Sequence, residues 1–264
     1  MSVDEVLDHY GRGIELDRFA SGYSRIEFAR TKELLERFLP DAPASVLDVG
    51  GGPGAYAAWL AQRGYRVHLV DPVPLHVEQA AARGGFTAAL GDARRLDEAD
   101  SRYDAVLLLG PLYHLTERAQ RIGALAEACR VVRPGGIVAA AAISRFASLL
   151  DGLKYARLRD PAFRAIVERD LADGQHRNPE HRPEWFTTAY FHRPEELAQE
   201  LAEAGLTVED TFGVEGPGWL LGQVWDDEEQ RDSVLYAARA VERDPGLIGL
   251  SAHLLAVGRR PGAG

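Results

Sequence analysis

The feature that most constrains this chain is a glycine-dense turn within residues 45–60, which read Ser-Val-Leu-Asp-Val-Gly-Gly-Gly-Pro-Gly-Ala-Tyr-Ala-Ala-Trp-Leu. The pattern predicts a short apolar strand, a turn and then a helix. Asp48, Gly50, Gly52 and Gly54 occupy alternate positions, D-x-G-x-G-x-G. Glycine lets the backbone turn tightly and approach a ligand closely, and the first N–H groups of the following helix have no partner within that helix. The segment therefore predicts an α/β sheet with a ligand at this turn.

A second acidic residue, Asp71, directly follows the next apolar run, residues 66–70. An acidic residue about 20 positions after a glycine turn can accept hydrogen bonds from ribose hydroxyls, so the two features together predict a nucleoside-containing cofactor. In the dinucleotide pattern G-x-G-x-x-G a pyrophosphate lies over the helix N-terminus. Here the third glycine comes one residue earlier, and Asp48 would repel a pyrophosphate but favour a cationic ligand.

This acidic turn resembles motif I of the class I S-adenosylmethionine (SAM)-dependent methyltransferases. Later segments follow in that family's order: Gly91-Asp92-Ala93 at its adenine-binding position, residues 103–109 as its fourth strand, 110–115 where its cofactor and substrate pockets meet, and 130–136 before its fifth strand. The resemblance covers about residues 45–144. It implies SAM as the cofactor and S-adenosylhomocysteine (SAH) as the product. The sulfonium and ammonium groups of SAM suit an acidic turn.

Apolar runs alternate with helical patterns along the chain. The runs are residues 45–49, 66–70, 86–90, 104–109 and 136–143, and the helical segments between them lie near 54–63, 74–83 and 117–131. Nearly continuous apolar strands that alternate with helices predict a parallel sheet covered on both faces. The resemblance implies a Rossmann-like, doubly wound, seven-stranded and mostly parallel sheet whose last strand is antiparallel. Ligands on such sheets bind beyond the carboxyl ends of the strands, so the turns after the first four strands should line one pocket.

The expected organisation has four parts. They are an N-terminal helical lid (1–43), a SAM-binding α/β core (44–144), a helical substrate cap (145–193) and the C-terminal part of the core (194–264). The polar loop 174–183 within the cap is expected to be solvated, including His176 and His181.

The resemblance implies cofactor contacts from the glycine turn and from the acidic turns that follow it. The candidates are Asp48, Gly50, Gly51, Gly52, Gly54, Asp71, Pro72, Asp92, Ala93, Gly110, Tyr23 and Arg30. Asp71 would accept from the ribose and Asp92 from the adenine amino group. Tyr23 would offer an aromatic face to the sulfonium, and Arg30 would pair with the carboxylate of SAM. Each residue also has an ordinary structural explanation, such as an aspartate that accepts N–H groups within its own turn.

Tyr113 and His114 are the candidate catalytic residues, because the segment after the fourth strand would face the methyl group. A histidine can act as a general base near neutral pH, although it can equally be a packing residue. Methyl transfer needs no base when the nucleophile already carries a lone pair, and alignment then dominates. The expected substrate contacts are Tyr10, Tyr113, His114, Tyr190, His192, Glu215 and Trp219.

Composition argues against several classes of function. The formal net charge is −10 and basic runs are short, whereas nucleic-acid backbones attract Lys and Arg clusters. A single cysteine cannot form an internal disulfide and fits a reducing compartment. The absence of C-x-x-C and H-E-x-x-H spacings predicts no metal site, and the absence of a long apolar run predicts no membrane span. We expect a cytoplasmic monomer or homodimer that acts on a small molecule.

The predicted function is methyl transfer from SAM to an N, O or C atom of a small molecule, for instance a secondary metabolite. Three alternatives stay open. The first is a SAM-binding enzyme that catalyses another reaction, such as an elimination or ring closure. The second is a non-catalytic SAM-binding regulatory module. The third, an NAD-linked oxidoreductase, is disfavoured by the glycine spacing. The sequence leaves the substrate, the acceptor atom, the need for a base and the oligomeric state undetermined.

Overall fold

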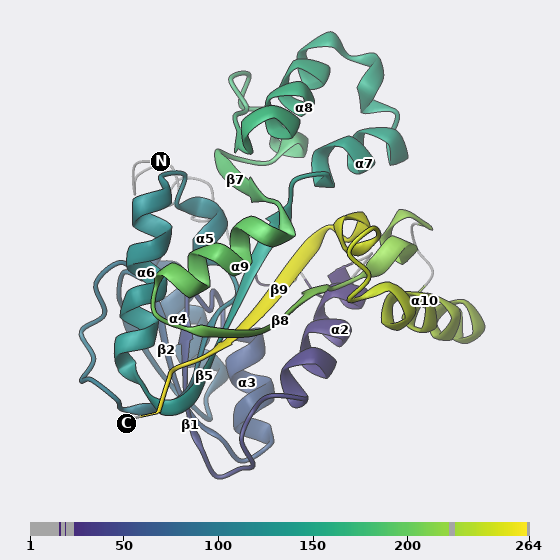
Figure 1. Cartoon of the computed structure of the whole chain (residues 1–264). Helices are drawn as coiled ribbons and strands as arrows, with labels where there is room; N and C mark the ends of the chain where they lie inside the picture. Colours follow the sequence, from purple (N-terminus) through teal and green to yellow (C-terminus); the bar gives the residue numbers. More distant parts are fainter. Residues whose placement is uncertain (1–15, 17–18, 20–23, 222–224, 263–264) are drawn as a thin grey trace.

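The computed structural model describes Leu16, Phe19 and residues 24–221 and 225–262 of the 264-residue chain. It forms a sheet of nine strands with helices on both faces (Figure 1). The strands are β1 (Ser45–Val49), β2 (Arg66–Asp71), β3 (Thr87–Leu90), β4 (Tyr103–Leu108), β5 (Val132–Ser144), β6 (Gln175–His176), β7 (Ala189–His192), β8 (Thr207–Gly213) and β9 (His253–Arg259). The α-helices are α2 (Ser24–Glu36), α3 (Ala55–Gln62), α4 (Pro74–Arg83), α5 (Pro111–His114), α6 (Arg118–Val131), α7 (Ala147–Lys154), α8 (Pro161–Asp173), α9 (Pro194–Glu203) and α10 (Glu228–Val241).

The central sheet confirms the predicted fold class. Its order is β3-β2-β1-β4-β5, all parallel, and β9 then pairs antiparallel with both β5 and β8. These seven strands make the expected mostly parallel sheet with an antiparallel last strand. The other two strands belong to the segment predicted as a helical cap. The end of β5 pairs parallel with β7, and β6 pairs antiparallel with β7.

Each face of the sheet has its own apolar core, as expected for a parallel sheet covered on both sides. On one face, α6 and α9 pack on alternate strand residues such as Val106, Val138 and Ala140. On the opposite face, α2, α3 and α4 pack on the other set, such as Leu107 and Ala139. We call this second side the α2 face. Helix α10 lies outside α2 (Figure 1), where Val234 packs against Ile26.

Helices α7 and α8 stand away from the end of the sheet (Figure 1) and have a small apolar core of their own around Phe163 and Trp185. His176 belongs to this unit and is buried, so the expectation that it is solvated is wrong, whereas His181 is exposed as expected. Nδ1 of His176 lies 2.8 Å from Oδ2 of Asp170, and Nε2 lies 2.8 Å from the carbonyl oxygen of Trp185. Two polar contacts thus compensate this imidazole for its burial.

Candidate cofactor and substrate site

The glycine turn after β1 adopts a backbone that only glycine tolerates well. Gly50, Gly52 and Gly54 have φ values of 66°, 56° and 82°, and positive φ is costly for other residues. Gly51 is required for space, because a Cβ atom there would lie 2.5 Å from Oδ2 of Asp48 and 2.6 Å from Leu69. The turn therefore brings bare backbone to the carboxyl edge of β1.

Asp48 lies under this turn, and its side chain is fully buried. Neither carboxylate oxygen makes a regular hydrogen bond within the described part of the chain. Burial raises the pKa of Asp48 to about 7, the nearby Asp71 carboxylate acts in the same direction, and the N–H of Ala57 offsets part of the rise. A buried carboxylate without hydrogen bonds is costly, so the structure offers a cationic ligand a strong partner here.

Asp71, at the end of β2, is fixed by the backbone on both sides. Its Oδ2 accepts a hydrogen bond of 2.9 Å from the N–H of Gly52, and its Oδ1 accepts one of 2.9 Å from the N–H of Val73. Nδ1 of His76 lies 3.1 Å from the same Oδ1. The Asp71 carboxylate therefore connects the glycine turn to the start of α4 and lies where these two segments meet.

Asp92, after β3, forms a paired site with Arg94. The Arg94 side chain reaches Oδ2 of Asp92 at 2.6 Å, and the backbone N–H of Arg94 donates to Oδ1 at 2.9 Å. The hydrogen bond from the Arg94 guanidinium lowers the pKa of Asp92, so this carboxylate is ionised at neutral pH. A carboxylate has about four acceptor positions, which leaves Asp92 able to accept from a ligand as well.

Residues of these turns line one cavity at the carboxyl edge of the sheet. Of the predicted cofactor and catalytic residues, Asp48, Gly50, Gly51, Gly52, Asp71, Pro72, Asp92, Ala93, Gly110, Tyr113 and His114 line it. The remaining lining residues, which the sequence reasoning did not assign, include Phe19, Tyr56, Val73, His76, Arg94 and Pro111. Position could have indicated two of them, because Tyr56 lies in the first turn of α3 and His76 lies in the first turn of α4.

Tyr113 and His114 lie on the short helix α5, where the sequence predicted only a turn. Pro111 starts this helix, as proline often does at a first helical position, and it packs against the turn at Gly50. The rings of Tyr113 and His114 meet edge to face with centroids 4.6 Å apart. Both rings also approach Phe186, which precedes β7. The α5 rings thus form the wall of the cavity that faces the segment 145–193.

Two predicted cofactor residues do not line the cavity. Gly54 is the N-cap residue of α3, and a Cβ atom there would meet Phe86. Arg30 is completely buried between α2 and α10, where it forms ion pairs with Glu33 and Glu242 and donates to the carbonyl of Val214 at 3.2 Å. Its charge is neutralised there, so Arg30 takes no further part in the proposed site. Tyr10 and Tyr23 lie outside the described residues.

Tyr190 and His192, predicted as substrate contacts, also do not line the cavity. Both lie on β7 and join a buried polar network with Arg121 of α6 and Glu200 of α9. Nε2 of His192 lies 3.2 Å from Oε2 of Glu200, and the Arg121 guanidinium carbon lies 3.6 Å from the Tyr190 ring centre. These residues connect the segment 145–193 to α6 and α9.

Glu215 and Trp219, also predicted as substrate contacts, follow β8. The indole N–H of Trp219 donates to the carbonyl of Leu250 at 2.8 Å, and the ring is buried. Glu215 is fully buried against His253, the first residue of β9, and Glu27 of α2 lies beside them. The sequence reasoning did not single out Glu27 or His253, because only the tertiary fold brings these three positions together.

Residues 46–136 match the family described as "Methyltransferase domain". A ubiquinone biosynthesis O-methyltransferase of Methylobacterium sp. is 32% identical over 180 residues, which cover 66% of this chain and 64% of that protein. The chain thus spans a little under two thirds of this relative's length.

Two solved structures share the fold over nearly the whole chain. A structure from the complex between the Haloferax volcanii Trm112 methyltransferase activator and a methyltransferase aligns with a TM-score of 0.65 at 18% identity, covering 98% of this chain and 99% of that one. The [4+2]-cyclase SpnF aligns with a TM-score of 0.55 at 18% identity, covering 90% of this chain and 82% of that one. Among the described residues, no helix combines the length and the apolar character that crossing a membrane requires.

Proposed function

We propose that this chain, which belongs to the class I SAM-dependent methyltransferases, transfers the methyl group of SAM to a nucleophilic atom of a small molecule. The observation that carries the proposal is the arrangement of Asp48, Asp71 and Asp92 around one cavity, after three successive strands of the sheet. SAM offers one partner to each of them. Its ammonium and sulfonium suit Asp48, its ribose hydroxyls suit Asp71, and its adenine amino group suits Asp92.

The residues present fit this cofactor on structural grounds. The two oxygens of Asp48 are buried beside the cavity and lack regular hydrogen bonds within the described chain. The turn at residues 50–52 presents backbone without side chains, so the ligand can approach closely. Tyr56, with Phe19 packed against it at a centroid distance of 5.6 Å, supplies an aromatic surface at the same cavity. Aromatic faces attract cations such as a sulfonium.

Bound SAM supplies an electrophilic methyl group on a positively charged sulfur. The protein's residues then have two tasks: they hold the acceptor atom in line with that methyl group, and they exclude water. Alignment of two reactants is worth several kcal/mol in general, about 7–11 in the best intramolecular cases. Tyr113 and His114 are placed for this task, because they line the cavity next to Gly110 and Pro111 at the end of β4.

The acceptor is proposed to be a small molecule, for instance a secondary metabolite. The chain carries a formal net charge of −10, which opposes binding of nucleic acids. The Methylobacterium relative is named an O-methyltransferase of ubiquinone biosynthesis, which makes small molecules the first class to screen. We propose that the protein works in the cytoplasm, as a monomer or homodimer, consistent with its single cysteine.

Calorimetric titration with SAM, SAH and NAD tests the cofactor assignment. We expect micromolar binding of SAM and SAH and no signal with NAD. Asp71→Ala and Asp92→Ala should each weaken SAM binding about tenfold or more, since each removes a hydrogen bond to a charged group, which is worth about 1.5–3 kcal/mol. If both variants keep the unaltered affinity, the assignment of this cavity to SAM is wrong.

Product analysis separates methyl transfer from the other reactions of a SAM-binding protein. Incubation with SAM and a screen of small molecules should yield SAH and a product heavier by one methyl group. A product without added methyl, formed only when SAM is bound, would instead identify an elimination or ring closure. SAM binding with no turnover of any compound would favour a regulatory module.

A further inference from the structure

Phe186, which follows the 3₁₀ turn Pro183–Trp185, has a backbone conformation that residues with a side chain rarely adopt. Its φ is 63° and its ψ is 175°. This combination is found almost only in glycine, and a bulky residue there is strained and persists only where the surrounding structure fixes it. Strained residues of this kind cluster at active sites and ligand sites. The contacts of the Phe186 ring therefore indicate what the strain maintains.

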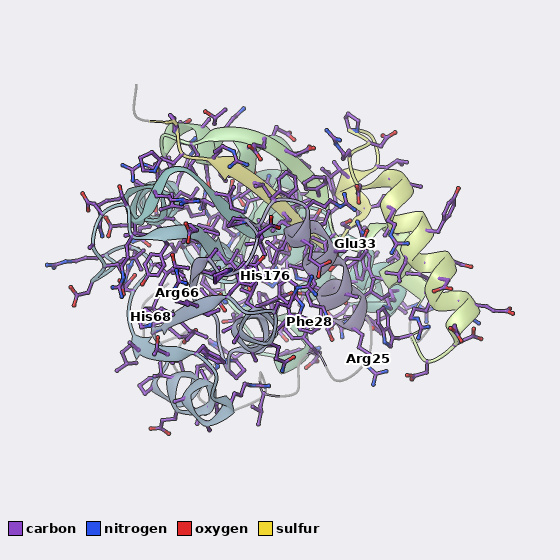
Figure 2. All side chains as sticks on the ribbon, turned by 90° about the horizontal axis from the view of Figure 1, so that it is seen from below. Arg25, Phe28, Glu33, Arg66, His68 and His176 are labelled. Atoms are coloured by element: carbon purple, nitrogen blue, oxygen red, sulfur yellow. The ribbon has the colours of Figure 1, made fainter. Side chains whose placement is uncertain are left out.

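The peptide groups on both sides of Phe186 are held by side chains of the same segment. Nε2 of His176, which Figure 2 labels, lies 2.8 Å from the carbonyl oxygen of Trp185. Nδ2 of Asn178 donates to the carbonyl oxygen of Phe186 at 2.8 Å. The same Asn178 side chain donates to the carbonyl of Arg182 at 2.7 Å and accepts from its N–H at 3.2 Å. These hydrogen bonds fix both torsion angles of Phe186, so the direction of its ring is fixed as well.

The Phe186 ring is directed toward helix α5. Its centroid lies 6.2 Å from that of His114, with the two planes 30° apart, and 6.4 Å from that of Tyr113. Phe186 also packs against the apolar cluster to which Tyr113 belongs. Tyr113 and His114 line the cavity, whereas Phe186 is not one of its lining residues. Phe186 can therefore affect the site only through the two α5 rings.

The part of the cavity next to α5 carries no carboxylate, ammonium or guanidinium group. Among the described residues that line the cavity, the Asp and Arg side chains lie on β1, on β2 or just after β3; they are Asp48, Asp71, Asp92 and Arg94. The segment 109–115 contains no Asp, Glu, Lys or Arg. A charged acceptor beside α5 would lose its hydration without gaining a counter-charge. A flat ring, by contrast, can pack on Tyr113 and His114 edge to face or with an offset.

We propose that Phe186 is a positioning residue that holds the rings of Tyr113 and His114 against the acceptor, and that this acceptor carries a flat, uncharged ring. The inference rests on the proposed function and narrows its substrate class. The two α5 rings form the surface on which the acceptor ring lies, and Phe186 fills the space into which they would otherwise turn. The acceptor atom then meets the methyl group in one orientation, which is the alignment that methyl transfer needs.

A purely structural role is the rival explanation, because the cluster that Phe186 packs against also contains Ile143, Ala147, Ala189 and Phe191. Loss of the ring would then lower stability and weaken every acceptor alike. A positioning role instead predicts loss of the preference for flat over puckered rings. The ratio of two affinities thus separates the two explanations.

The test is calorimetry on the SAH-loaded protein with three matched probes. They are 2-naphthol, its saturated counterpart decahydro-2-naphthol and the anion 6-hydroxy-2-naphthoate. We expect 2-naphthol to bind about tenfold more tightly than decahydro-2-naphthol, a factor that two ring contacts can supply. The anion should also bind more weakly than 2-naphthol, since no counter-charge compensates its lost hydration.

Substitutions at position 186 show whether the preference depends on the ring. Phe186→Ala should remove most of the preference for 2-naphthol and leave SAH affinity unchanged. Phe186→Tyr keeps an aromatic ring and should retain the preference. His181→Gly is the matched control, because His181 lies in the same loop, also has a positive φ of 52° and is exposed. It should bind all three probes like the unaltered protein.

Urea unfolding tests the strained backbone separately. Phe186→Gly and Phe186→Ala both remove the ring, but only glycine adopts this conformation without strain. Phe186→Gly should therefore unfold at a higher urea concentration than Phe186→Ala, although both lose the preference for 2-naphthol. A variant that is more stable than Phe186→Ala and equally defective in that preference separates the role of the ring from stability.

Three results would overturn the proposal while SAH binding stays intact. The first is 2-naphthol that does not bind, or that binds no more tightly than decahydro-2-naphthol or the anion. The second is a preference for 2-naphthol that survives Phe186→Ala. The third is greater stability of Phe186→Ala than of Phe186→Gly, which would mean that the backbone is not held in the strained conformation. Failure of SAH itself to bind would instead contradict the proposed function, so the two failures are distinguishable.

Discussion

At the scale of single residues, Asp48 determines how cofactor binding should depend on pH. Burial holds the pKa of Asp48 near 7 in the unliganded protein, so at pH 6 this group is mostly protonated. A cationic ligand favours the carboxylate, so binding at low pH must first release a proton. We expect SAM affinity to fall about tenfold between pH 7.5 and pH 6.0, since each pH unit below the pKa costs nearly tenfold.

Calorimetry in buffers of different ionisation enthalpy measures that proton directly. Close to one proton should be released per SAM at pH 6, and far less at pH 8. Asp48→Asn should bind more weakly with no proton released. Unchanged proton release in this variant would mean that a group other than Asp48 loses the proton when SAM binds.

The same residue affects the stability of the unliganded protein. The pKa of Asp48 is higher in the folded chain than its ordinary value of 3.8. Between about pH 4 and pH 7 the folded state therefore holds a proton that the unfolded state has lost. The free energy of unfolding accordingly falls as the pH rises through this range. Asp48→Asn should remove that part of the slope and stabilise the protein at pH 8 by up to a few kcal/mol. Urea unfolding at pH 5 and pH 8 measures how the free energy of unfolding changes with pH. The same change in the unaltered protein and in Asp48→Asn would contradict the argument that burial raises the pKa of Asp48.

At the scale of secondary-structure elements, one buried ion pair joins α6, α9 and the segment after α5. Arg121 contacts Oε1 of Glu200 at 2.7 Å and donates to the carbonyls of Leu115 and Thr116 at 2.9 and 3.0 Å. Burial alone would raise the pKa of Glu200, but hydrogen bonds from His192 and Arg121 hold it below its ordinary value. The pair therefore fixes the segment that directly follows Tyr113 and His114.

Removing one partner of this pair should be strongly destabilising. Arg121→Met leaves a buried carboxylate without its main partner and should lower the free energy of unfolding by about 3–5 kcal/mol. Arg63→Met is the control, because Arg63 and its partner Glu36 are both about half exposed and exposed pairs contribute about 1 kcal/mol or less. Urea unfolding of the two variants gives the comparison. Equal losses would mean that burial does not distinguish the pairs.

At the scale of the whole molecule, the cofactor cavity gathers turns from β1, β2, β3 and β4. A ligand that touches all four stabilises the folded chain as a unit. At a concentration 100 times its Kd, SAH should add about 2.7 kcal/mol to the free energy of unfolding and raise Tm by about 5–10 °C. NAD at the same concentration should leave Tm unchanged. A single cooperative transition with and without SAH would show that the shift belongs to the whole fold.

The order of residues along the chain was enough to predict the class of fold and the edge of the sheet that carries the proposed cofactor site. Apolar runs of strand length specify buried parallel strands whatever surrounds them, and a glycine turn needs only its own residues to reach positive φ. Asp48, Asp71 and Asp92 could therefore be placed at one edge from their order along the chain. The extent of α4, Pro74–Arg83, was also predictable, because a proline start and a glycine stop are local signals.

Contacts between side chains that are far apart in the sequence could be found only in the folded structure. Arg30 looked like a ligand for a carboxylate until α10 supplied Glu242 as its partner. Glu27, Glu215 and His253 are separated by 188 and 38 positions (215 − 27 and 253 − 215), yet they meet because α2 packs beside β8 and β9. No local pattern records such a meeting, since it depends on how sheet order and helix packing fold distant segments onto one face.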